Sequence, residues 1–150
     1  MQKEDIEAAL IEACPGFEAT VRRTGAEGVS DLVYVTLGQF AGYLLSAQRE
    51  NRTDDLRRAG ELIERMHLRG DSYVREAATI GALEGIQNVW SNEGADPDLF
   101  AEYLYPESKR WWISLNRFWN GEISRVGADI KDGEPGATDN PDNAQRVRED

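Results

Sequence analysis

Apolar residues recur at three- and four-residue spacing along most of the first 119 positions, which is the period of an amphipathic α-helix. One such segment covers residues 5–14 and stops at a proline-glycine pair. The next covers residues 31–50 and has Ser30 as a candidate cap. The β-branched residues among positions 33–36 leave a strand open at its start.

A third helix is predicted to begin at Thr53, a capping residue that is followed by Asp54 and Asp55 at the positive helix end. Its apolar side ends near Met66, and the opposite side carries most of its charges. A glycine then ends this helix and Asp71 caps the following one, which is typical of a tight turn between antiparallel neighbours.

The helix predicted over residues 72–91 is apolar around most of its circumference, so we expect it to be central. Gly81 and Gly85 interrupt it, and each glycine costs about 1 kcal/mol of helix stability relative to alanine. Close packing of a neighbouring helix against these two positions would explain that cost.

Prolines mark the first turns of two further predicted helices. Asp96 before Pro97 predicts a capped short helix that runs to about Leu104, and Pro106 opens the last helix in the same way. Large apolar side chains recur along this last helix, and we expect most of their rings to close the end of the core. They are Trp111, Trp112, Leu115, Phe118 and Trp119.

Together these patterns predict an all-α fold of about six helices, either an irregular helical bundle or a short HEAT-like stack of antiparallel helix pairs. A single domain is expected over residues 1–120. Residues 121–150 are rich in glycine, proline and charge, which predicts a polar, flexible C-terminal tail that the domain does not need in order to fold.

Charge narrows the classes of partner. The 150 residues carry a formal net charge of −11, which disfavours binding to nucleic acid or to an anionic membrane. The acidity either serves a basic protein partner or only keeps the protein in solution. The start of the chain shows no basic segment leading into an apolar run, and no apolar stretch is long enough to span a bilayer. We therefore expect a cytoplasmic protein.

Candidate catalytic chemistry is sparse. Cys14 and His67 are the single cysteine and the single histidine, so neither a disulfide within the chain nor a histidine-rich zinc site can form. Glu64 and His67 match one half of a di-iron motif that requires two such pairs. We expect His67 to be half-buried near a helix end whose dipole favours its charged form. No metal, cofactor or enzymatic activity is predicted.

Two segments of the sequence resemble those of a known protein family. The stretch GDSYVREAATIGALEGIQN from Gly70 and the stretch PESKRWWISLNRFW from Pro106 resemble a bacterial all-helical domain family that is associated with polymorphic toxin systems. YVTLGQFAGYLL from Tyr34 matches its second helix less closely. The resemblance implies an immunity protein that binds a cognate antibacterial toxin and neutralises it by stoichiometric protein–protein inhibition.

An alternative is a non-enzymatic helical scaffold or adaptor that has no toxin partner. For either function, exposed carboxylates at helix starts and in loops are the best candidates for contact with the partner. The predicted partner-binding residues are Asp54, Asp55, Glu61, Glu64, Glu93, Asp96 and Asp98.

Overall fold

A computed structural model describes residues 1–24 and 32–130, and every regular element in these ranges is helical. The elements are η1 (Lys3–Asp5), α1 (Ile6–Ala13), η2 (Pro15–Phe17), α2 (Glu18–Thr24), α3 (Leu32–Arg49), α4 (Thr53–Arg69), α5 (Ser72–Glu76), η3 (Ala77–Leu83), α6 (Glu84–Asn92), α7 (Asp98–Ala101) and α8 (Pro106–Trp119). The all-α prediction is confirmed, and positions 33–36 are helical. No described helix combines the length and the apolar character that crossing a bilayer requires.

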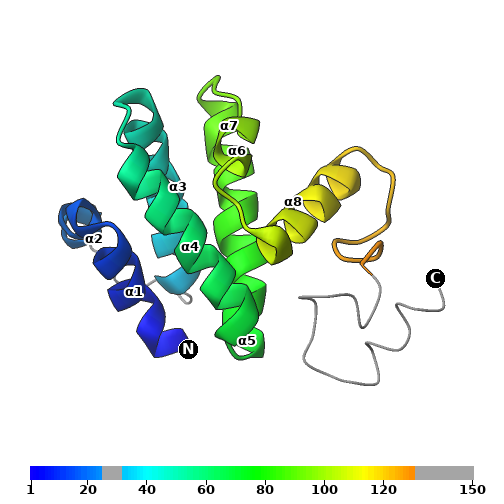
Figure 1. Cartoon of the computed structure of the whole chain (residues 1–150), viewed down its shortest axis with the longest axis horizontal. Coiled ribbons are helices and arrows are strands. Elements are labelled where there is room, and N and C mark those ends of the chain that lie inside the picture. Colours follow the sequence, from blue (N-terminus) through cyan, green and yellow to red (C-terminus); the bar gives the residue numbers. More distant parts are fainter. Residues whose placement is uncertain (25–31, 131–150) are drawn as a thin grey trace.

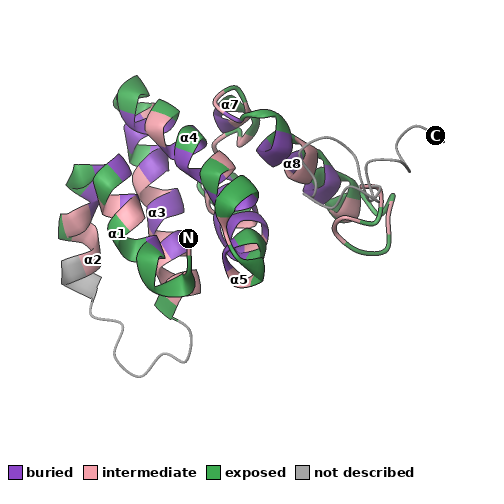
Figure 2. Ribbon diagram, turned by 60° about the horizontal axis from the view of Figure 1, so that its bottom comes forward, coloured by how far each residue is buried: buried purple, intermediate pink, exposed green. Residues whose placement is uncertain are grey.

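The helices form an irregular bundle around one continuous rod. This rod consists of α5, η3 and α6 in succession, and the antiparallel pair α3 and α4 packs beside it (Figure 1). α1 and α2 lie on the outer side of that pair, and α8 lies on the other side of the rod (Figure 1). Residues on the inward faces of the helices are mostly buried, whereas those on the outward faces are mostly exposed (Figure 2).

The turn between α3 and α4 shows why the chain reverses there. Asn51 adopts the left-handed conformation with φ 60°, which asparagine tolerates better than most residues. The N–H of Arg52 donates to the carbonyl of Ala47 at 2.8 Å, and the N–H of Asn51 donates to that of Gln48 at 3.3 Å. These two bonds make a Schellman motif, which satisfies the last carbonyls of α3 and turns the chain into α4.

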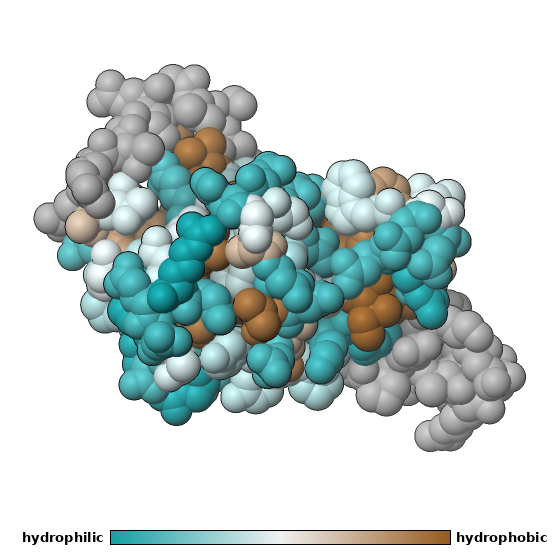
Figure 3. Space-filling model, turned by 90° about the horizontal axis from the view of Figure 1, so that it is seen from above, coloured by the Kyte–Doolittle hydropathy of each residue, from teal (hydrophilic) through white to brown (hydrophobic). Residues whose placement is uncertain are grey.

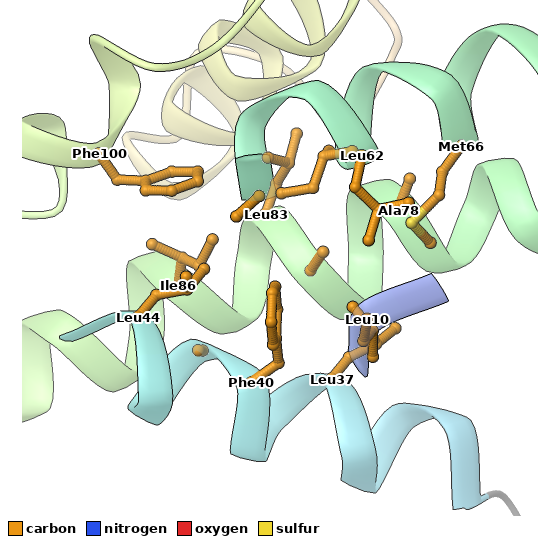
Figure 4. Close-up of a cluster of buried hydrophobic side chains, with 14 of the residues drawn as sticks. Leu10, Leu37, Phe40, Leu44, Leu62, Met66, Ala78, Leu83, Ile86 and Phe100 are labelled. Carbon is orange, nitrogen blue, oxygen red and sulfur yellow. The ribbon is translucent and has the colours of Figure 1, made fainter. Parts of the chain in front are cut away.

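The core lies where α3, α4 and the rod meet. Leu37, Phe40 and Leu44 of α3 point toward Leu83 and Ile86 of the rod (Figure 4). From α4, Leu62 and Met66 close the same cluster, and each side chain named here is at most 1% exposed. Burial of such a side chain stabilises the fold by about 1.5–3 kcal/mol, so this cluster is the main source of stability.

The predicted close approach at the glycines of the rod is found at one of them. A Cβ on Gly81 would lie 2.5 Å from Cδ1 of Leu37, so α3 packs directly against the glycine backbone. A Cβ on Gly85 would meet only ordinary contacts, the nearest at 3.9 Å. Among the glycines in the described residues, the tightest approach is at Gly60 of α4, where a Cβ would overlap the carbonyl oxygen of Tyr103.

Two of the predicted helix caps are present in the structure, and a third is not. Asp71 accepts from the N–H of Val74 at 2.9 Å and caps α5 as expected, and Asp96 accepts from the N–H of Asp98 at 2.9 Å at the start of α7. Thr53 does not cap α4, because the turn begins one residue earlier and the carbonyl of Arg52 accepts the first bonds. α7 ends at Ala101, short of the predicted Leu104. Ser30 lies outside the described residues.

The aromatic prediction for α8 is largely wrong. Among the four rings only Trp112 is buried, whereas Trp111 and Phe118 are half-buried and Trp119 is 56% exposed. The cause is the direction of α8, whose first turns pack on α4 and η3 while its end points away from the bundle (Figure 1). The helical spacing is therefore correct, but only one edge of the helix meets the core.

Residues 121–130, which we call the C-terminal strap, fold back on α8. The N–H of Gly127 donates to Oγ of Ser114 at 2.6 Å, and that hydroxyl donates to Asp129 at the same distance. Gly127 has φ 89°, and a Cβ there would lie 2.7 Å from the ring of Trp111. Val126 packs against the core from outside. This first part of the sequence-predicted tail thus contacts the domain, and residues 131–150 lie outside the described part.

Substitution of Gly60 tests the close approach of α4 to Tyr103. We expect Gly60→Ala to lower the free energy of unfolding by about 2–3 kcal/mol, because backbone must move to admit the methyl group. The matched control is Gly42→Ala within α3, where no atom lies within 4 Å of the new Cβ, and this variant should gain about 0.5–1 kcal/mol. Urea unfolding followed by circular dichroism measures both. Similar effects of the two substitutions would contradict the packing described here.

Truncation tests the strap. A chain that ends at Ile130 should have the same melting temperature as the full chain, because the sequence beyond it lacks a periodic apolar face. A chain that ends at Asn120 should melt about 5 °C lower, because it loses the contacts of Val126 and the bonds to Ser114. Equal melting temperatures of the two chains would show that the strap contributes nothing to stability.

Candidate functional site

The structure divides the seven predicted partner-binding carboxylates into two groups. Four of them belong to α4, and Glu93, Asp96 and Asp98 lie together in and beside the connection from α6 to α7. Two of the α4 carboxylates, Asp55 and Glu64, accept hydrogen bonds within the fold. The second group is exposed, and its three carboxylates lie within six residues of one another in the sequence.

Asp55 is a buried carboxylate whose hydrogen bonds connect helices. Its side chain is 12% exposed and accepts from the hydroxyl of Tyr43 at 2.8 Å, from Arg58 at 2.7 Å and from Arg52 at 3.3 Å. Burial, together with the bond to Asp55, raises the pKa of Tyr43 to about 12. Burial also raises the pKa of the Cys14 thiol to about 12, and this thiol contacts the Asp55 carbonyl at 3.5 Å. Asp55 therefore holds α1, α3 and α4 together.

Glu64 caps a helix that lies 43 residues further along the chain. Its carboxylate accepts from the N–H of Glu107 at 3.1 Å and from both the N–H and the hydroxyl of Ser108 at 2.9 Å. The residue before α8, Tyr105, provides no side-chain cap of its own. Glu64 supplies the missing acceptor and a negative charge at the positive end of α8.

The remaining carboxylates of α4 are exposed but lie among cations. Asp54 pairs with Arg57 at 2.8 Å, and Glu61 is followed by Arg65 one turn later. Exposed pairs of this kind contribute little to stability, and their fields largely cancel at a distance. The outer face of α4 is thus mixed in charge, which disfavours it as the surface that attracts a basic partner.

The second group forms what we call the acidic end, which consists of Glu93, Asp96, Asp98 and Glu102. All four are exposed, and no lysine or arginine occurs between Glu93 and Glu102. Figure 3 looks down on this end of the molecule and shows a largely hydrophilic surface in which apolar patches are small and separate. Glu102 was not predicted, although the absence of cations from this stretch of sequence is a signal that could have found it.

Backbone and side-chain bonds fix the acidic end in place. Gly94, with φ 75°, ends α6, and Arg49 of α3 donates to the carbonyl of Glu93 at 3.0 Å. Asp98 accepts from the indole N–H of Trp112 at 3.2 Å, which connects this end to α8. The carboxylates of Glu93 and Glu102 make no hydrogen bond within the described residues, so their charge faces solvent.

His67 is the centre of a buried polar network that the sequence did not reveal. Its side chain lies between two hydroxyls, with Nδ1 3.0 Å from Oγ of Ser108 and Nε2 2.9 Å from Oγ1 of Thr79. Because the Ser108 hydroxyl donates to Glu64, it can only accept from Nδ1–H. Burial lowers the pKa of His67 to about 4, so the imidazole is neutral at pH 7 and Nε2 accepts from the Thr79 hydroxyl.

The expectation that His67 is half-buried and favoured in its charged form is wrong. The residue is 5% exposed, and burial lowers its pKa to about 4 although the nearby Glu64 carboxylate acts in the opposite direction. Loss of hydration outweighs the helix dipole at this position. Within the described residues, no group of three or more histidine, cysteine and acidic side chains could hold a metal ion.

This burial makes stability depend on pH. Unfolded His67 takes up its proton near pH 6.5 and folded His67 near pH 4, so between these values the unfolded state binds one more proton. The free energy of unfolding is therefore not reduced by His67 above pH 6.5. It falls by about 3 kcal/mol in total as the pH decreases from 6.5 to 4. We expect His67→Gln to remove this dependence. Urea unfolding at pH 7, 6 and 5 measures it, and carboxylate titration, common to both proteins, cancels in the difference. Parallel pH profiles would contradict the assignment.

Comparison with curated proteins and with solved structures found no significant match. A comparison with protein families matched residues 7–120, which include every described helix from α2 to α8 and most of α1. Both the acidic end and the His67 network lie within the matched region. The chain therefore belongs to the family described as Domain of unknown function (DUF7674).

Proposed function

We propose that this protein is an immunity protein, a cytoplasmic inhibitor that binds a basic antibacterial toxin stoichiometrically and turns over no substrate. The observation that supports the proposal is the acidic end, where four exposed carboxylates occur within residues 93–102 and no lysine or arginine lies between them in the sequence. The resemblance of the segments from Gly70 and Pro106 to a toxin-associated family supports the same function.

The acidic end has the features of a surface that captures a basic protein. A net charge of −11 attracts such a partner over about one Debye length, and a local cluster of carboxylates directs it to one side of the molecule. Leu99, which is 41% exposed, lies among these carboxylates in the sequence and offers an apolar anchor. Charged rims around such anchors set association rate and specificity more than they set final affinity.

The alternative of a scaffold or adaptor without a toxin predicts a different experimental result. Co-expression of the chain with the protein encoded beside its gene distinguishes the two functions. Under the proposal, the neighbouring protein arrests growth when expressed alone, and co-expression restores growth and yields a one-to-one complex on gel filtration. A neighbouring protein that is harmless and forms no complex would rule out the immunity function for this pair.

Charge reversal tests the surface. Because Asp55 and Glu64 hold the fold and Asp96 and Asp98 shape α7, the suitable residues are Glu93 and Glu102. We expect Glu93→Lys with Glu102→Lys to slow association with the basic partner about tenfold at low salt and to weaken growth protection. Stopped-flow mixing measures the rate.

The matched control is Glu4→Lys with Glu12→Lys, which makes the same change in net charge with two exposed residues at the other side of the bundle. The control should slow association much less. At 1 M salt, where the Debye length is about 3 Å, the three proteins should associate at similar rates. Equal slowing by both pairs at low salt would assign the effect to net charge and would remove the acidic end as the docking surface.

A further inference from the structure

A cavity of about 370 Å³ opens between α5, the π-helical segment η3, the start of α8 and the strap. It lies near the α5 end of the rod, whereas the acidic end is at the opposite end of that rod (Figure 1). Its walls include Ile80, Trp111 and Val126, and His67 and Thr79 contribute polar atoms. Cavities of this size hold small organic molecules, and a few polar groups among apolar walls are typical of them.

Two parallel rings line the cavity. The planes of His67 and Trp111 are inclined by only 1°, and their centroids are 6.4 Å apart. His67 is held on both nitrogens by hydroxyls, so its ring cannot rotate without breaking hydrogen bonds. A flat ligand that lies parallel to these planes would contact a fixed aromatic surface, which is the geometry that favours an aromatic ring as occupant.

The remaining walls are equally restrained. η3 is a π-helical segment, a geometry that proteins use rarely and often at functional sites, and it contributes Thr79 and Ile80 to the cavity. On the opposite side, the bond from Gly127 to Ser114 and the close approach of Gly127 to Trp111 hold the strap, and with it Val126, over the cavity. The site is therefore preorganised, which lowers the cost of binding.

The rim carries two opposite charges that are free to meet a ligand. Arg75 and Glu76 are exposed neighbours that line the cavity, and within the described residues neither makes an ion pair or a side-chain hydrogen bond. A third charged group, Glu107, is 2% exposed and is paired with Arg110 at 3.0 Å. A ligand with one anionic and one cationic group would complement the two exposed charges at once.

We propose that this cavity binds a small zwitterionic aromatic molecule of the aromatic α-amino acid class. Its ring lies against Trp111, between Ile80 and Val126, its carboxylate faces Arg75 and its ammonium group faces Glu76. The proposal does not depend on inhibition of a toxin, because it concerns a different part of the molecule and a different class of ligand.

Calorimetric titration of the full chain with L-tryptophan, L-tyrosine and L-phenylalanine tests the proposal. We expect saturable one-to-one binding of at least one of them. The single-charge analogues tryptamine and indole-3-propionate should bind more weakly than L-tryptophan. Absence of saturable binding by all five compounds at millimolar concentration would overturn the proposal, and equal binding of the charged analogues would overturn the assignment of the two rim charges.

Variants locate the site. Trp111→Ala should weaken binding about tenfold or more, because it removes the stacking surface. The matched control is Trp119→Ala on the same helix, whose ring is 56% exposed and lies outside the cavity, and it should bind as the unaltered chain does. Binding that survives Trp111→Ala would place the ligand elsewhere.

Surface variants keep the test decisive if Trp111→Ala does not fold. Arg75→Ala removes an exposed side chain and should weaken binding of L-tryptophan and indole-3-propionate about threefold while leaving tryptamine unaffected. Glu76→Gln should weaken binding of L-tryptophan and tryptamine and leave indole-3-propionate unaffected. Thermal melting by circular dichroism confirms that both variants are folded. Variants that affect all three ligands alike, or none, would contradict the proposed orientation.

Discussion

The carboxylate of Glu64 is the constraint on which the position of α8 depends. It accepts three hydrogen bonds from the first turn of α8, and the Ser108 hydroxyl that it orients in turn orients His67. The second nitrogen of His67 then engages Thr79 of the rod. One continuous chain of bonds thus connects α4, α8 and η3. A buried network of this kind stabilises the fold only when each member is satisfied, and this requirement selects a single arrangement of the three helices.

Both proposed sites depend on that arrangement. Trp112 of α8 donates to Asp98 in the acidic end, and its neighbour Trp111 forms a wall of the cavity. The strap is attached to the same helix through Ser114. Displacement of the start of α8 would therefore disturb the acidic surface, the aromatic wall and the strap together, although the residues concerned are distant from Glu64 in the sequence.

The features that could be predicted from the sequence are those with local causes. The period of apolar positions predicts the helices that follow position 31, and Asp71 is predictable as a cap from its place after a glycine. Gly81 predicts close packing of a neighbouring helix, which the structure identifies as α3. The burial of His67 and the role of Glu64 depend on partners 12 to 44 residues away. No spacing rule within one helix contains that information.

The same distinction explains why only part of the acidic prediction defines a surface. Asp54 and Asp55 are adjacent in the sequence, yet one turns to solvent and the other accepts bonds from Tyr43 and Arg58. Successive helical residues point about 100° apart, so a carboxylate count along α4 mixes structural and exposed groups. Glu93 follows α6 and Glu102 follows α7, and within the described residues both carboxylates remain exposed without competing bonds.

The two proposed sites lie at opposite ends of one rod, and this arrangement limits how they can influence each other. A ligand in the cavity changes affinity at the acidic end only if it binds two arrangements of the protein with different free energies. The candidate for such an element is the start of α8, since Trp111 belongs to one site and Trp112 contacts the other. Because the Glu64 network holds that turn in one arrangement, a ligand that fits the cavity as it stands stabilises the folded protein without reshaping the acidic surface.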